Sequence, residues 1–96
     1  MATILTGKFP DKDGTLTSFD RMPVEVTRDG RRLHFRVTGS GAGSATLDDG
    51  SARGLFRTLD GNDFGFEVET EPGGIRYRIF QGTAQIATGR IFNLPP

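Results

Sequence analysis

The feature that most constrains this chain is the alternation of apolar and polar residues in short runs, each followed by a turn that contains glycine. A period of two places successive side chains on opposite faces of a β-strand, and no window shows the period of a helix. The 14 glycines and 5 prolines stand between the apolar runs rather than in one block, which is typical of turns. The pattern predicts an all-β fold of antiparallel strands.

Composition limits the size and the surroundings of this fold. The 96 residues predict one domain over residues 1–96, because so short a chain does not support two independent cores. Cysteine is absent, and residues 2–9 are too short and too polar for a secretory leader, so we expect a cytoplasmic protein. No apolar run approaches the roughly 20 residues of a membrane helix. Because 12 basic residues balance 12 acidic ones, we expect neither a membrane nor a nucleic acid as partner.

Residues 22–37 predict a hairpin. The dipeptide Asp29-Gly30 favours a two-residue type I′ turn, which needs two positive φ angles. A turn there pairs three sets of inward-facing residues: Val26 with Leu33, Val24 with Phe35, and Met22 with Val37. On the outward face it pairs Glu25 with His34 and Thr27 with Arg32.

Residues 64–80 predict a second hairpin, which turns through residues 71–74. Its inward pairs are Val68 with Tyr77 and Phe66 with Ile79. Its outward pairs, Glu69 with Arg76 and Glu67 with Arg78, have opposite charges. Such pairs contribute about 0.2–1 kcal/mol each and indicate which face meets water.

The segment between these hairpins is open to two interpretations. Residues 44–48 and 52–59 predict a hairpin about Asp49-Gly50, and residues 60–63 predict a turn into the next strand. The first turn directs Phe56 inward with Leu47 and Ala52, whereas the second directs Leu55 and Leu59 inward. A bulge near Gly54 would reconcile the two. Residues 39–43, which are rich in glycine, form either a flexible loop or a thin strand, and we prefer the loop.

The two ends of the chain resemble each other. Residues 4–9 and 86–91 both contain Thr-Gly followed by a cation, and we interpret them as two terminal strands that pair and close the sheet. About eight short strands then form a small antiparallel up-and-down barrel. A two-sheet β-sandwich is the second choice.

Catalytic and metal-binding signatures are absent from the sequence. There is no cysteine and no Gly-x-Ser-x-Gly motif, and His34 lies between Arg32 and Arg36 on what we interpret as a solvated strand face. One histidine without cysteine does not supply the usual zinc ligands. Residues 11–14 and 60–63 lack the ligand series of a calcium loop and indicate ordinary turns. We predict no catalytic residue, no metal and no cofactor.

One pair of motifs suggests a phosphate ligand. Arg28 and Arg32 have the spacing Arg-x-x-x-Arg, and residues 49–54 have the spacing Asp-x-Ser-x-x-Gly. Together they resemble the two-part motif of the PilZ family, which are barrels that bind the bacterial second messenger cyclic di-GMP. The resemblance implies that Arg28 and Arg32 clamp the ligand and that Asp49, Ser51 and Gly54 complete the site. Guanidinium groups suit the geometry of phosphate.

The interior of the barrel is a further candidate site. The predicted inward residues are largely apolar, with the Tyr77 hydroxyl as a polar tip, and Arg57 joins them if Leu55 and Leu59 also face inward. A barrel of about eight strands either packs solid or holds one small ligand. Eight phenylalanines and no tryptophan favour the solid interior.

Three hypotheses of function follow from these observations. The first is a non-catalytic binding or assembly module with an unknown protein partner or with self-association, through a sheet or through the hairpin at residues 64–80. The second is a PilZ-like barrel that binds cyclic di-GMP. The third is a pocketed barrel that binds or cyclises a small hydrophobic molecule. Fold alone does not choose among them.

Overall fold

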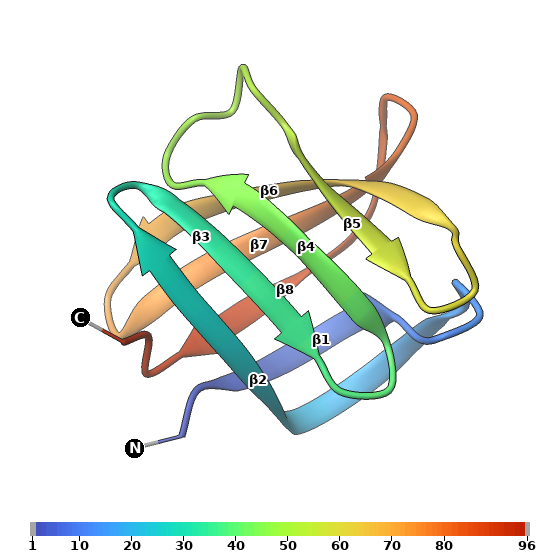
Figure 1. Cartoon of the computed structure of the whole chain (residues 1–96), viewed down its shortest axis with the longest axis horizontal. Helices are drawn as coiled ribbons and strands as arrows, with labels where there is room; N and C mark the ends of the chain where they lie inside the picture. The colour runs from blue at the N-terminus through green and yellow to red at the C-terminus, as the bar shows by residue number, and fades with distance from the viewer. Residues whose placement is uncertain (1, 96) are drawn as a thin grey trace.

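The chain forms a closed antiparallel barrel in which each strand pairs with the next and the last pairs with the first (Figure 1). The structure is a computed structural model that describes residues 2–95, so the first and last residues of the predicted domain lie outside it. The eight strands are β1 (Ile4–Pro10), β2 (Leu16–Asp29), β3 (Arg32–Val37), β4 (Gly41–Thr46), β5 (Gly54–Thr58), β6 (Asp63–Glu71), β7 (Gly74–Gln81) and β8 (Ala84–Phe92). This topology confirms the predicted up-and-down barrel rather than the sandwich. Within the described residues, no helix is long and apolar enough to cross a membrane.

The β2–β3 hairpin has the predicted faces but a different register. Val26 lies opposite Phe35 and Val24 opposite Val37, so the predicted partners were wrong by two residues. The outward partners also differ, because Glu25 lies opposite Arg36 and Thr27 opposite His34. The turn begins one residue later than predicted: Gly30 has a φ of 62° and occupies the first central position, as a type II′ turn requires. A shift of two residues preserves the inward set.

The β6–β7 hairpin confirms its prediction. Phe66 lies opposite Ile79, Val68 opposite Tyr77, and Glu71 opposite Gly74, so the turn consists of Pro72 and Gly73. Gly73 has a φ of 86°, and proline followed by such a glycine satisfies a type II turn. The charged residues are opposite each other as predicted, but their ion pairs run diagonally: Arg78 to Glu69 at 2.7 Å and Arg76 to Glu71 at 2.8 Å.

The middle of the chain contains the largest departures from the predictions. Residues 41–43, predicted as part of a loop, belong to β4 and pair with β5. A Cβ atom at Gly41 or Gly43 would collide with the backbone of β5, so this close pairing requires glycine there. A seven-residue connection over residues 47–53 joins β4 to β5 in place of the tight hairpin about Asp49-Gly50. That connection, rather than a bulge near Gly54, reconciles the two predicted turns.

Strand β5 directs Phe56 inward and leaves both of its neighbouring leucines outside. Phe56 is fully buried, whereas Leu55 is 50% exposed and Leu59 is 68% exposed. The interpretation based on Phe56 is therefore confirmed for that residue, and the inward placement of Leu55 and Leu59 is wrong. Ala52 was predicted to face inward with Phe56 but is exposed, because it lies in the connection before β5 begins.

The barrel closes where β1 meets β8, as the similarity of the two ends predicted. Leu5 lies opposite Ile91 and Gly7 opposite Gly89. Gly7 has a φ of 135° at an irregularity in the pairing of β1 with β2. The hydroxyl of Tyr77 donates a hydrogen bond to the carbonyl of Lys8 at 2.6 Å. A Cβ atom at Gly7 would lie 2.8 Å from this hydroxyl, and one at Gly89 would also collide with it. Both glycines are therefore needed for closure.

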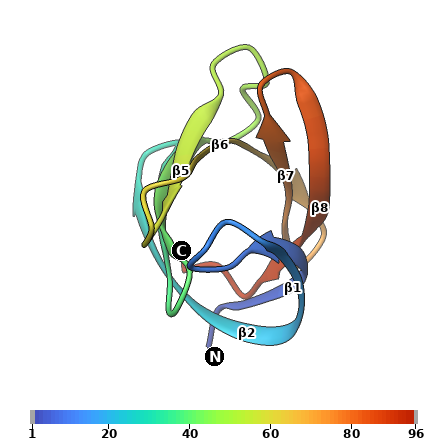
Figure 2. The ribbon, with the colours of Figure 1, turned by 90° about the vertical axis from the view of Figure 1, so that its right-hand side faces the viewer.

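Aromatic rings pack the middle of the barrel. Phe9 contacts Phe56 and Tyr77 edge to face, with ring centroids 4.7 Å and 5.3 Å apart. Phe66 contacts Phe35 in the same way at 4.9 Å. Rings at these distances and angles stabilise one another beyond the area that they bury. Figure 2 shows the strands that surround this cluster, with the β7–β8 hairpin extending beyond β1.

Replacing Phe66 by alanine tests the core. Phe66 is fully buried, so Phe66→Ala should lower the free energy of unfolding by about 3–5 kcal/mol in a urea titration, because the side chain leaves a cavity. The control Leu59→Ala removes an exposed side chain and should change it by about 0.5 kcal/mol or less. A loss below about 1 kcal/mol for Phe66→Ala would contradict the inward placement of this strand face.

The closing tyrosine makes a prediction about alkaline pH. Burial raises the pKa of the Tyr77 hydroxyl above its ordinary value, which is about 10. The unfolded chain then loses this proton at a lower pH than the folded chain, so the contribution of Tyr77 to stability is complete below about pH 10 and declines as the pH rises above it. Tyr77 is the only tyrosine and there is no tryptophan, so tyrosinate absorbance reports this group alone. Tyr77→Phe should remove this part of the pH dependence. If Tyr77 in the folded protein ionised with the ordinary pKa of a tyrosine, about 10, the assignment would be contradicted.

Candidate functional site

The outer surface over β4 combines small side chains with cationic and apolar ones. Because Leu33, Phe35 and Val37 point into the barrel, the alternate residues of β3 point outward. We call this surface the β4 face and define it by Arg32, His34 and Arg36 of β3, Ala42 and Ser44 of β4, Leu55 and Arg57 of β5, and the following Leu59. The short side chains of β4 form its floor.

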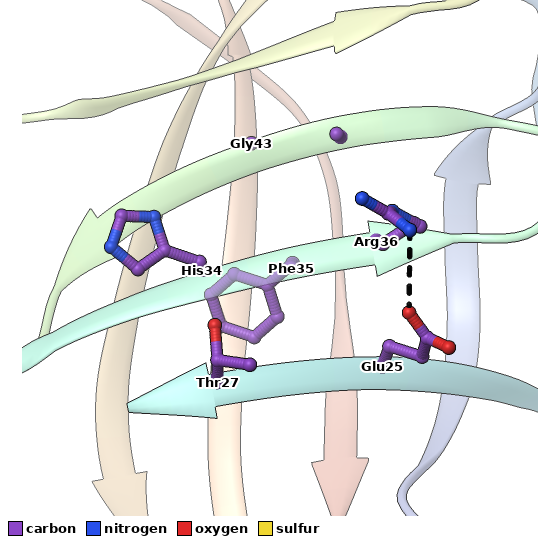
Figure 3. Close-up of a pocket in the computed structure, with 7 residues that line it drawn as sticks. Glu25, Thr27, His34, Phe35, Arg36 and Gly43 are labelled. Carbon is purple, nitrogen blue, oxygen red and sulfur yellow. Dashed lines mark ion pairs between the residues drawn. The ribbon is translucent and has the colours of Figure 1, made fainter. Parts of the chain in front are cut away.

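Three open clefts adjoin one another on the β4 face, and Ala42 lines all of them. The first, of about 250 Å³, lies toward β2 and is shown in Figure 3, where Glu25 reaches across to Arg36 and His34 lies farther along β3. The second, of about 440 Å³, lies between Arg32 and Arg57. The third, of about 510 Å³, extends past the end of β5. The clefts together follow β4 along the outside of the barrel.

The apolar part of the β4 face comes from two leucines. Leu55 and Leu59 are the exposed large hydrophobic residues of the described chain. Leu55 lines the second cleft and Leu59 the third. Single exposed leucines are common on protein surfaces, but these two border adjoining clefts, and that arrangement is the informative one.

The cations of the β4 face differ in how firmly they are held. Arg57 makes two hydrogen bonds to the Asp63 carboxylate, at 2.6 Å and 3.1 Å, and this contact lowers the pKa of Asp63 and raises that of Arg57. Arg36 lies 3.7 Å from Glu25, and both side chains are largely exposed, so the pair contributes little.

Arg32 has the least electrostatic compensation on this face. Its guanidinium donates a hydrogen bond to the Ser44 hydroxyl at 2.9 Å. Among the described residues, no carboxylate lies within ion-pair distance of it. The β3 side of the β4 face is therefore cationic, and the neighbouring carboxylates lie at its borders, with Glu25 and Asp29 on β2 and Asp63 on β6.

The structure separates the two arginines of the predicted phosphate clamp. Arg32 lies on the outer face of the β2–β3 hairpin, whereas Arg28 has the inward parity of Val24 and Val26 and lies at the rim of the barrel. There its Nε donates to the carbonyl of Gly30 at 3.1 Å. Arg28 also borders a rim cleft of about 320 Å³.

The second half of the predicted clamp has local structural contacts. The Asp49 carboxylate accepts hydrogen bonds from the hydroxyl and the backbone N–H of Ser51, at 2.8 Å and 3.2 Å, and the hydroxyl contributes most to lowering the pKa of Asp49. Gly54 begins β5, where a Cβ atom would collide with the carbonyl of Ser44. The arginine that approaches this connection is Arg31, which donates to the carbonyl of Leu47 at 2.7 Å.

The two candidates for an interior site have other roles. Tyr77 is fully buried and its hydroxyl is bound to Lys8. Arg57 points outward to Asp63. The structure therefore does not bring these two side chains together inside the barrel.

The loops that resemble calcium sites are stabilised as turns. The Asp11 carboxylate accepts hydrogen bonds from the backbone N–H groups of Asp13 and Thr15, at 2.9 Å and 3.1 Å. The N–H of Asp13 contributes most to lowering the pKa of Asp11. The Asn62 amide donates to the carbonyl of Asp13 at 3.0 Å. No group of three or more His, Cys, Asp or Glu side chains in residues 2–95 could hold a metal ion.

Most of the β4 face was absent from the predicted site. The prediction included Arg32 and Arg57 but not His34, Arg36 or the two leucines. The signal was present in β3, where every outward position carries a cation or the histidine. It was interpreted as a solvated strand face, and the first half of the strand that forms the floor, residues 41–43, was predicted as a loop.

Comparison with known proteins gives no further guide to the site. No protein-family model matches the chain, and neither the curated proteins nor the solved structures include a significant match.

Proposed function

We propose that this chain is a non-catalytic binding module that docks a protein partner on the β4 face. The observation that carries the proposal is the row of three adjoining clefts over Ala42, bordered by the exposed Leu55 and Leu59. Covering these leucines would bury apolar surface at about 25 cal/mol per Å², and the arginines around them would orient the partner.

Closure of the barrel favours a face over an edge as the docking surface. Every strand pairs with two neighbours, so none offers a free edge along its whole length to an added strand. Residues 84–88 of β8 run beyond the pairing with β1 (Figure 2). A register shift at Ile86 interrupts that stretch, and bulges of this kind blunt an edge.

The β6–β7 hairpin is a weaker docking surface than the sequence suggested. Its outward charges compensate one another through the ion pairs of Arg78 with Glu69 and of Arg76 with Glu71. Glu67 is held by Arg53 at 2.6 Å. Fewer unsatisfied groups remain there to recognise a partner than on the β4 face.

The chemistry of the β4 face also favours binding over catalysis. The Ser44 hydroxyl accepts a hydrogen bond from Arg32 rather than facing a base, as an activated nucleophile does. Among the hydrogen bonds and ion pairs of the described residues around it, none orients the His34 imidazole as a base. The cyclic di-GMP and interior-ligand hypotheses stay predictions, and neither gains support from the positions of Arg28 and Tyr77.

Site-specific photo-crosslinking tests the proposal. A photoreactive amino acid at position 55, in cells that naturally produce the chain, should give one discrete protein adduct that mass spectrometry identifies. The same group at Gln85, an exposed residue of β8, should not give that adduct. The variant Ala42→Trp should abolish the adduct, because its side chain fills the space that all three clefts share, while circular dichroism and thermal unfolding stay unchanged.

The controls separate a docking surface from general stickiness. The same adducts at positions 55 and 85, or an adduct that survives Ala42→Trp, would contradict docking on the β4 face. An adduct of twice the protein's own mass would replace the proposed partner by a second copy of this chain, and light scattering would then show a dimer.

A further inference from the structure

We propose that the segment that docks on the β4 face is an extended acidic one, with carboxylates at alternate positions and apolar side chains between them. This inference rests on the proposed function and specifies the chemistry of the partner. It follows from the width of the face, the spacing of its cations and the position of its leucines.

The width of the β4 face selects an extended chain. The floor consists of the single strand β4, and its walls are the side chains of β3 and β5, which pair with β4 on either side. Neighbouring strands are about 4.8 Å apart, so these walls stand roughly 10 Å apart at the backbone. An α-helix with its side chains is about 10–12 Å wide and would not reach Ala42 between the walls, whereas an extended segment would.

The two arginines and the histidine of the β3 wall set the period. Arg32, His34 and Arg36 occupy successive outward positions of one strand, so their Cα atoms are about 6.6–6.8 Å apart. Alternate side chains of an extended segment repeat at the same distance. A segment that runs along β4 with an acidic residue at every second position would therefore present one carboxylate to each of these side chains.

The opposite wall accounts for the residues in between. Leu55 and Leu59 flank Arg57 on the outward side of β5, and Arg57 is already bound to Asp63. Side chains that point away from β3 would meet this wall, where apolar residues gain most from covering the leucines. An acidic side chain there would compete with Asp63.

Two other occupants fit the face less well. In a symmetric dimer the face meets itself, so Arg32 and Arg36 would approach the same cations of a second copy, which is unfavourable. Single-stranded nucleic acid is bound by aromatic side chains on which bases stack, and the residues that define the β4 face include no Phe, Tyr or Trp.

A peptide titration tests this inference with the intact protein. The probe is a short fluorescein-labelled peptide in which Glu and Leu alternate. Its binding is measured by the fluorescence anisotropy of the peptide and by the amide chemical shifts of the protein. We expect saturable binding, with shifts concentrated at Ala42, Ser44 and Leu55. Binding should weaken at least about tenfold as salt rises from about 50 to 300 mM, because exposed charges are screened. Two control peptides are a Lys-Leu alternation and a peptide of the same composition with Glu and Leu in separate blocks.

Charge reversal provides a matched pair of variants. Arg32→Glu should weaken binding of the Glu-Leu peptide roughly tenfold or more, because it reverses the charge of an arginine of the face that has no ion pair. Arg28→Glu makes the same charge change on the same hairpin but on its other face, and should weaken binding less than about twofold. Unfolding curves of both variants confirm that each is folded.

The outcomes distinguish the inference from the proposed function. Shifts on the β4 face with equal affinity for the Glu-Leu, Lys-Leu and block peptides would overturn the acidic, alternating partner while leaving the face as a docking surface. Shifts located elsewhere on the barrel would contradict both. No binding at millimolar peptide would overturn the inference, and the crosslink at position 55 would still decide the proposed function independently. Tighter binding of a poly-uridine probe than of the Glu-Leu peptide would replace the acidic segment by nucleic acid.

Discussion

The close approach of β1 and β8 at Gly7 and Gly89 is the constraint on which the rest of this barrel depends. Without side chains at these positions, the Tyr77 hydroxyl reaches the carbonyl of Lys8 and links β7 to β1 across β8. The same ring packs against Phe9 in the aromatic core. Closure and core packing are therefore one arrangement, since the residue that fills the interior also holds the first and last strands together. It also explains why both terminal strands contain a glycine at the same place in their similar sequences.

A second set of small residues shapes the opposite wall and, with it, the candidate site. Gly43 faces the interior and leaves space that the Phe56 ring occupies, since a Cβ atom there would lie 2.9 Å from that ring. On the outer side of the same strand stand Ala42 and Ser44, so β4 is low on both faces. The larger side chains of β3 and β5 then rise on either side of it. The groove over β4 therefore lies outside the same strand whose small inward residue makes room for Phe56.

Turn residues and the alternation of apolar and polar residues predicted the hairpins of this fold, because these features depend on neighbouring residues. The β6–β7 hairpin followed from a Pro-Gly turn and from self-consistent pairs on both faces, and its register is as predicted. In the β2–β3 hairpin the faces followed from alternation, but glycine fits either central position of a two-residue turn, so the register was off by two. Strand β4 was predicted only from residue 44 onward, because glycine has low strand propensity and residues 41–43 were assigned to a loop. Residues 41–43 form a strand because they pair with β5, and a local sequence pattern does not reveal that contact. The groove over β4 was not predicted for the same reason.

The charges of this protein show why composition is a poor guide to its surface. Acidic and basic residues are equal in number, yet they are not mixed evenly. On β6, β7 and β8, Arg76, Arg78 and Arg90 each have a carboxylate partner at 2.7–3.0 Å. On β3 the cations are held loosely: Arg32 donates a hydrogen bond to a hydroxyl, and Arg36 lies 3.7 Å from a glutamate in a pair that is largely exposed. Because screening limits exposed charges to about 10 Å, an ion near the β4 face would experience the local excess of positive charge and not the neutral total. A net charge of zero is thus compatible with a cationic patch on the surface, and the arrangement of ion pairs determines where that patch lies.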